Sequence, residues 1–129
     1  MMMLAPILCA SAWVIDGDSI RCSNIGEIRL LGIETPDYRA SPPCRGHFGD
    51  HVCDDHAAKA ATRSLIAVVK RNRSAIRIEP VTHDRYGRTV AEVWAGHVEL
   101  SCYQLRAGVA RYMVKYDNGR RIAAACGRL

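Results

Sequence analysis

The sequence lacks any long apolar run. No stretch of its 129 residues reaches the roughly 20 consecutive apolar residues that a membrane-spanning helix requires. It also lacks low-complexity segments and internal repeats, while 49% of the residues are hydrophobic and 24% are charged. This balance is typical of a folded soluble domain and excludes a disordered chain. We therefore expect no membrane partner and a chain that folds alone.

The chain is also too short for two ordinary domains. Its length matches one domain, so any active site must be built on a single core. We expect one domain over residues 1–129. Nothing in the sequence suggests an obligate dimer, so we expect a monomer.

Acidic residues are in the minority. Lysine and arginine total 18 against 13 aspartates and glutamates, which gives a net charge of +5. A basic surface favours polyanionic partners such as nucleic acid, although many small basic proteins carry such charge only for solubility.

Cysteine, in contrast, is abundant. The six cysteines are an even number and more than a reduced cytosolic domain of this size usually has. We therefore expect a secreted or periplasmic protein. Residues 1–12 are apolar and end in small residues, as a signal peptide does, but they lack its basic start. They are either a signal-peptide remnant or the first strand.

Short apolar segments between turn residues predict the strands. These are residues 7–15, 19–23, 27–33, 75–79 and 89–94. A helix is predicted over 54–71 from apolar residues at helical spacing, with acidic residues at its start and basic ones at its end. Shorter helices are expected over 98–107 and 119–126, and residues 35–53 form a long proline- and glycine-containing loop.

The alternation of strands and helices that a parallel crossover sheet needs is missing. Short strands with one helix after the third suit a small closed barrel. We expect an α+β, mainly β fold: a five-stranded OB-fold barrel with one helix after the third strand and short C-terminal helices.

The long loop permits two interpretations. It is rich in zinc-ligand types, namely Cys44, His47, His51, Cys53 and His56. Their spacing matches no known zinc-finger pattern, so a disulfide from Cys44 to Cys53, with surface histidines, is the simpler interpretation. Cys102 and Cys126 would then join the last two helices, which leaves Cys9 and Cys22 on neighbouring strands. Sequence alone does not fix these pairings.

Carboxylates cluster at two strand ends. Asp16 and Asp18 flank a tight turn, where they could bind a divalent cation or simply form a hairpin. The third strand ends in Glu34, Thr35, Pro36 and Asp37, and the proline stops the strand ladder. We expect Glu34 and Asp37 to converge with Asp18 beside the mouth of the barrel.

Arginines accompany these carboxylates. Arg29 lies inside an otherwise apolar strand, where it must either pair with the carboxylates or bind a phosphate. The turn from Asp84 to Arg88 adds Arg85, Tyr86 and a second guanidinium, which suit phosphate recognition. Taken singly, the first is compatible with a structural ion pair and the second with a solvated basic turn.

Together these segments resemble the staphylococcal nuclease (thermonuclease) family. The resemblance rests on VIDGDSIRC, RLLGIETPD, DRYGR and a later LRAGVA, and it extends over residues 14–110. It implies an OB-fold barrel that holds one Ca²⁺ and hydrolyses DNA and RNA to products with a 3′-phosphate.

The resemblance also implies residue roles. The metal site would comprise Asp18, Glu34 and Thr35, the last through its backbone carbonyl. Arg29 and Arg88 would clamp the scissile phosphate, and Asp37 would act as general base. Arg85, Tyr86 and Tyr116 would bind the substrate.

The chain departs from the family pattern at the carboxylates. The family commonly uses an aspartate ligand and a glutamate base, whereas here Glu34 and Asp37 exchange those lengths. A misplacement of about one ångström can cost about a hundredfold in rate. Val114 stands where an aromatic residue is expected, and Ser19 replaces a threonine. The alternative function is therefore a catalytically weak or inactive module that binds single-stranded nucleic acid, as OB barrels often do.

Overall fold

The structure is a computed structural model that describes residues 5–46 and 51–127. His47 and the first four residues, which belong to the predicted loop and to the apolar start, lie outside this description. No helix in the described ranges is both long and apolar enough to span a bilayer.

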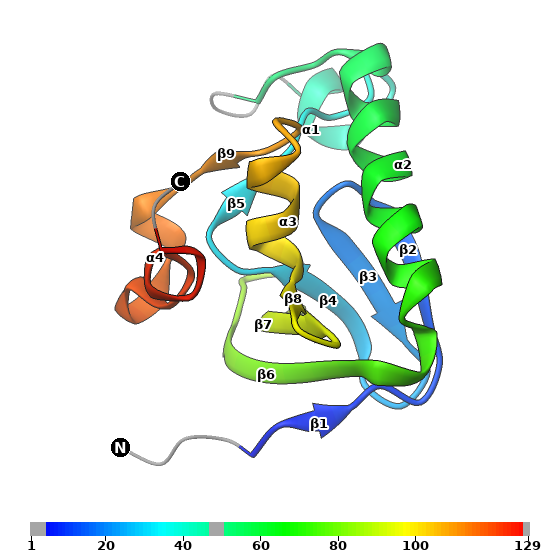
Figure 1. Ribbon diagram of the computed structural model, residues 1–129. Coiled ribbons are helices and arrows are strands. Elements are labelled where there is room, and N and C mark those ends of the chain that lie inside the picture. The colour runs from blue at the N-terminus through cyan, green and yellow to red at the C-terminus, as the bar shows by residue number, and fades with distance from the viewer. Residues whose placement is uncertain (1–4, 47–50, 128–129) are drawn as a thin grey trace.

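One curled sheet dominates the fold (Figure 1). Its strands follow the order β1 (Ile7–Leu8), β6 (Ile76–His83), β7 (Thr89–Ala95), β4 (Gly26–Leu30), β3 (Ser19–Cys22) and β2 (Ala12–Asp16), and β8 (Val98–Glu99) pairs with β7. The strands pair antiparallel except β4 and β7, which run parallel. A separate pair joins β5 (Ile33–Glu34) to β9 (Arg111–Tyr112).

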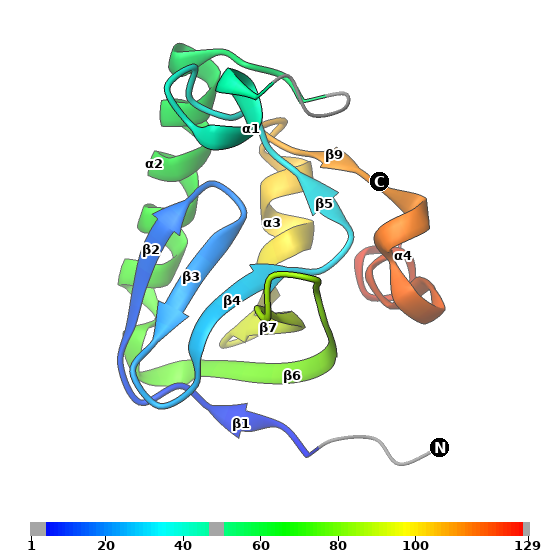
Figure 2. The same ribbon diagram turned by 180° about the vertical axis from the view of Figure 1, so that it is seen from behind.

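Four helices complete the described part of the fold. They are α1 (Pro42–Arg45), α2 (Asp55–Arg71), α3 (Leu100–Arg106) and α4 (Arg121–Cys126), with 3₁₀ turns η1 (Arg73–Ala75), η2 (Val114–Tyr116) and η3 (Asn118–Arg120). Figure 2 shows the reverse side, where α2 and α4 lie on opposite sides of the molecule. The predicted α+β OB-like class, with its long helix between the third and fourth predicted strands, is confirmed.

The long helix α2 forms where its sequence predicts. Asp54 caps the first turn by accepting a hydrogen bond from the Ala57 amide, and Lys70 and Arg71 complement the negative end of the helix dipole. Its apolar stripe is buried: Ala58, Ala61, Leu65, Val68 and Val69. Leu65, Val68 and Val69 belong to the main core with inward residues of the sheet, such as Ile20, Ile28 and Ile78.

Close packing of α2 fixes the turn between β2 and β3. A Cβ atom on Gly17 would lie 2.5 Å from Cβ of Ala61 and 2.9 Å from Oγ1 of Thr35. Only glycine permits this approach, so the turn that carries Asp16 and Asp18 is pressed between the helix and the end of β5.

Several element boundaries differ from the predictions. The strand predicted over 7–15 is two strands, because β1 pairs with β6 while β2 pairs with β3. The strand predicted over 27–33 is interrupted after Leu30, since Gly32 has a φ of +74° that turns the chain. The predicted loop contains α1, and β6 continues to His83. Residues 98–99 form β8 rather than the start of a helix.

Three disulfides join the cysteines. They link Cys9 to Cys22, Cys44 to Cys53 and Cys102 to Cys126. The first ties the segment between β1 and β2 to β3, so the apolar residues 7–9 are part of the fold. The last joins α3 to α4, and the middle one closes the loop that approaches the carboxylates.

Candidate active site

Arg29 connects two carboxylates at the mouth of the barrel. Its Nη1 lies 2.8 Å from Oδ2 of Asp18, and its Nη2 lies 3.1 Å from Oε2 of Glu34. The same two nitrogens donate to the backbone carbonyls of Asp18 and Ile33. All three side chains are at most 17% exposed. The guanidinium of Arg29, on β4, thus connects the β2–β3 turn with β5.

Asp18 is buried, and burial disfavours the charged form of its carboxyl group. Burial raises the pKa of Asp18 to about 7; the Arg29 cation opposes the shift, and the negative charges of Asp16 and Glu34 reinforce it. The Thr35 amide donates to its Oδ2, and Asp16 holds the turn by accepting from the Asp18 amide and the Ser19 hydroxyl.

This donor set suits a hard divalent cation. Carboxylate oxygens from Asp18 and Glu34 converge beside buried Thr35, and calcium takes carboxylate and carbonyl oxygens. A cation here would favour the ionised form of Asp18 that burial penalises. The residues present therefore fit the Ca²⁺ that the resemblance implies.

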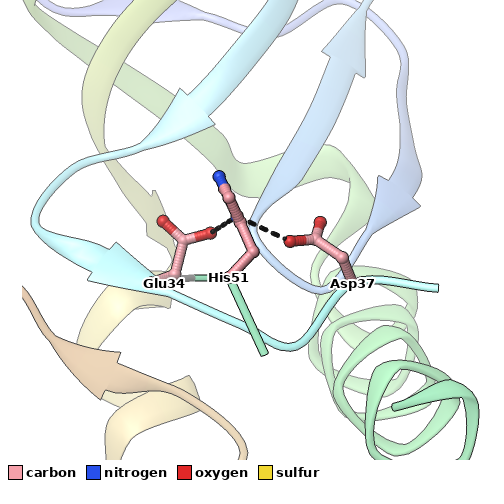
Figure 3. A group of neighbouring side chains, drawn as sticks. All are labelled: Glu34, Asp37 and His51. Carbon is pink, nitrogen blue, oxygen red and sulfur yellow. Dashed lines mark hydrogen bonds and ion pairs between the residues drawn. The ribbon is translucent and has the colours of Figure 1, made fainter. Parts of the chain in front are cut away.

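Asp37 lies next to this cluster, and His51 contacts it. Nδ1 of His51 is 2.9 Å from Oδ2 of Asp37 and 3.7 Å from Oε1 of Glu34. Figure 3 shows the imidazole between the two carboxylates. Each of these three residues offers a ligand atom, and the three atoms lie within 4.8 Å of one another, so they could also hold a metal ion.

The stapled loop positions His51. The Asp37 amide donates to the Val52 carbonyl, and the Asp54 amide donates to the Asp37 carbonyl. Cys53 forms a bridge with Asp37 and is held by its disulfide to Cys44. His51 lies at the surface, as the disulfide interpretation predicts, but its side chain, 32% exposed, also contacts the carboxylate cluster, which that interpretation does not include.

The disulfide also removes the zinc interpretation of this loop. Cys44 and Cys53 are bonded to each other, so neither offers a thiolate. His56 lies in the first turn of α2. In the sequence, the one feature that could have pointed to a role for His51 is its position two residues before Cys53. That position does not reveal which side chain His51 contacts.

Arg88, at the end of the β6–β7 turn, is held by a carboxylate of that turn and by one on β4. Its Nε donates to Oδ2 of Asp84 at 2.7 Å, and its Nη1 lies 3.4 Å from Oε2 of Glu27. Burial alone would lower the pKa of Arg88, but the hydrogen bond to Asp84 and the charges of Asp84, Glu27 and Asp18 raise it. In the described part of the chain its Nη2 has no hydrogen-bond partner, so this end of the guanidinium is available to a phosphate.

Arg85 and Tyr86 form the exposed tip of the same turn. Arg85 donates from Nη2 to the Tyr86 hydroxyl at 2.8 Å, and Tyr86 is 70% exposed. The guanidinium of Arg88 lies 5.7 Å from the centre of this ring. The turn therefore presents two cations and a phenol together.

Tyr116 lies apart from this turn, on η2. Tyr116 is 53% exposed, and the Lys115 ammonium lies 4.9 Å from the centre of its ring. η2 follows β9, which pairs with β5 at Glu34 and Arg111. A cavity of about 210 Å³ opens beside Glu34, lined also by Val52, Val109 and Ala110.

Comparisons with known proteins identify the family of this chain. The model of the family described as "Staphylococcal nuclease homologue" matches residues 27–125. A thermonuclease from Staphylococcus intermedius is 28% identical over 102 residues, which cover 76% of this chain and 55% of that protein. The chain thus spans about half the length of this relative. Because the family model matches most of the sequence, the chain belongs to the staphylococcal nuclease family.

Proposed function

We propose that this chain is a Ca²⁺-dependent nuclease that hydrolyses DNA and RNA and leaves 3′-phosphate products. The observation that carries the proposal is the Arg29 guanidinium, which holds Asp18 and Glu34 together beside Asp37 in a domain of this family. The name of the relative, thermonuclease, points to the same chemistry.

In the proposed mechanism, Asp18, Glu34 and the Thr35 carbonyl would hold the ion, and a bound Ca²⁺ would supply Lewis-acid polarisation of a phosphoryl oxygen of the substrate. Arg88 donates from its available Nη2 to the phosphate and stabilises the negative charge that develops at phosphorus. Nη1 and Nη2 of Arg29 already donate to the carboxylates and to backbone carbonyls of the site. Its Nε–H is therefore the donor that remains for the phosphate.

Asp37 is the proposed general base. It takes a proton from the attacking water, whose oxygen forms the new bond to phosphorus. The bond from phosphorus to the 5′-oxygen breaks, and this oxygen takes up a proton from solvent and leaves as a 5′-hydroxyl. The hydrogen bond from His51 to Oδ2 orients the carboxylate, and Oδ1 is proposed to take the proton. Arg85, Tyr86 and Tyr116 are proposed to bind neighbouring parts of the substrate.

Export and a single functional unit belong to the same proposal. Three disulfides favour an oxidising compartment, so we propose a secreted or periplasmic, monomeric, single-domain enzyme. Cell fractionation and size-exclusion chromatography test these points. Recovery from the cytosol with reduced thiols, or a stable dimer, would contradict them.

The test of the function is cleavage of single-stranded DNA with Ca²⁺ or with EDTA. We expect cleavage only with Ca²⁺ and its loss in Arg88→Ala and Asp37→Ala. Arg120→Ala, which removes an exposed arginine beside α4, is the control and should cut normally. Equal cleavage by all proteins, or cleavage in EDTA, would refute the proposal.

A second candidate is a module that binds single-stranded nucleic acid without cutting it. The exchanged lengths of Glu34 and Asp37 favour it, because a carboxylate displaced by about one ångström can cost about a hundredfold in rate. Intact substrate that shifts on a gel, with and without Ca²⁺, would establish this function instead.

A further inference from the structure

The outer face of β2, β3 and β4 links the candidate active site to α2. Side chains alternate between the two faces of a strand, and the pairing aligns Trp13 with Arg21 and Arg21 with Glu27. Ser19 and Arg29 form the next row on this face. Trp13 therefore lies two strands, or about 10 Å, from Glu27, which contacts Arg88.

Trp13 is the unusual residue of this row. It is 48% exposed, so much of its large apolar ring is open to solvent. Ile66 on the facing surface of α2 is 45% exposed. A hollow of about 230 Å³ between β2 and α2 is lined by Trp13, Ile66, Lys70 and Arg73. An apolar floor is thus bordered by cations.

The cations of this surface lack acidic partners. Within residues 5–46 and 51–127, none of Arg21, Lys70 and Arg73 forms an ion pair. Arg77 and Arg121, in contrast, do pair with glutamates. The positive charge beside Trp13 is therefore left to attract an anion from solution.

We propose that this surface binds single-stranded nucleic acid that extends beyond the cleavage site. Trp13 stacks on a base over the hollow, and Arg21, Lys70 and Arg73 contact flanking phosphates. Exposed aromatic rings among cations are how proteins hold single strands without sequence preference. The substrate class rests on the proposed function, while the surface is separate from the residues assigned to hydrolysis.

Fluorescence tests the surface directly. The chain has two tryptophans, so Trp94→Phe leaves Trp13 as the only tryptophan signal. We expect an oligothymidylate of about 12 nucleotides, added in EDTA, to quench this signal. Binding without any change in Trp13 fluorescence would overturn the proposal, as would a change caused by anionic lipid vesicles and not by the oligonucleotide.

Affinity variants supply the second measurement. Trp13→Ala should weaken oligonucleotide binding about 5- to 100-fold, and Trp13→Phe should retain most of it because the ring remains. Arg73→Glu should weaken binding and flatten its salt dependence. Arg120→Glu makes the same charge change near α4, on the side opposite α2, and should have a much smaller effect (Figure 1). Equal affinity for Trp13→Ala and wild type would refute the assignment.

The two proposals can fail separately. All binding is measured in chelator, so it does not depend on hydrolysis. If DNA is never cut but quenches the fluorescence of Trp13 and binds more weakly to Trp13→Ala, the binding surface is supported and the nuclease function is refuted. If DNA is cut with Ca²⁺ but Trp13→Ala binds it with the same affinity as wild type, the nuclease function is supported and the binding surface is refuted.

Discussion

Nδ1 of His51 lies 2.9 Å from Oδ2 of Asp37, so a histidine from the disulfide-closed loop holds the carboxylate proposed as general base. The loop backbone also bonds to Asp37 on both sides, through Val52 and Asp54. The segment that ends at the Cys44–Cys53 disulfide therefore also positions the proposed general base. This arrangement leads to two separate predictions.

Replacing His51 should lower catalysis more than stability. We expect His51→Asn to reduce kcat about tenfold or more, because residues that orient an active-site ligand typically contribute this much. Steady-state kinetics on single-stranded DNA measures it. His56→Asn, on the exposed first turn of α2, is the matched control. A wild-type kcat in His51→Asn would show that the contact is incidental.

Removing the Cys44–Cys53 disulfide should affect the same step. The Cys44→Ala, Cys53→Ala variant should lose about 2–3 kcal/mol of stability from loop closure and should also lose kcat, because Asp37 is no longer fixed. The Cys102→Ala, Cys126→Ala variant, which opens the link between α3 and α4, should lose stability with a smaller change in kcat. Chemical denaturation and kinetics separate the two effects. Equal kcat losses in both variants would contradict this account.

Arg29→Ala should destabilise the fold strongly. It leaves Asp18 and Glu34 without their buried counter-charge, which costs about 3–5 kcal/mol, whereas Arg77→Ala at an exposed pair should cost less than about 1 kcal/mol. Millimolar Ca²⁺ should raise the Tm of both wild type and Arg29→Ala, since a cation that binds the folded state stabilises it. A Tm that does not respond to Ca²⁺ in either protein would argue against the metal site.

Glu99 should make stability depend on pH. Burial raises the pKa of Glu99 to about 7 from its usual 4.5, despite hydrogen bonds from the Cys102 and Val93 amides. The folded state then binds more protons than the unfolded state between these values, so stability falls as pH rises from about 4.5 to about 7. The pKa of Asp18 shifts in the same direction, so Glu99→Gln should reduce the slope without abolishing it. Urea denaturation across this range measures the slope, and identical slopes would contradict the assignment.

The elements that the sequence predicts well are those with a local physical cause. The helix α2 has a capping residue, an apolar stripe and charged ends within one segment, and Arg29 in an apolar strand already requires an anionic partner. The division of β1 from β2 has no such local cause, because it depends on which distant strand each segment pairs with.

The same distinction explains what sequence reasoning missed at the site. His51 reaches Asp37 only through the path of a disulfide-closed loop, which residue spacing does not specify. The sequence places Glu99 inside a helix, whereas in the structure it is the last residue of β8. Its carboxylate accepts hydrogen bonds from two buried backbone amides, and its pKa is raised because tertiary packing buries it. Both residues owe their role to contacts between remote segments.

The most direct measurement is the identity of the product ends after wild-type protein acts on single-stranded DNA and RNA over a range of Ca²⁺ concentrations. The account predicts cleavage of both that rises with Ca²⁺, stops in EDTA and leaves a 3′-phosphate. Substrates that stay intact at every Ca²⁺ concentration, or products with a 3′-hydroxyl, would contradict it.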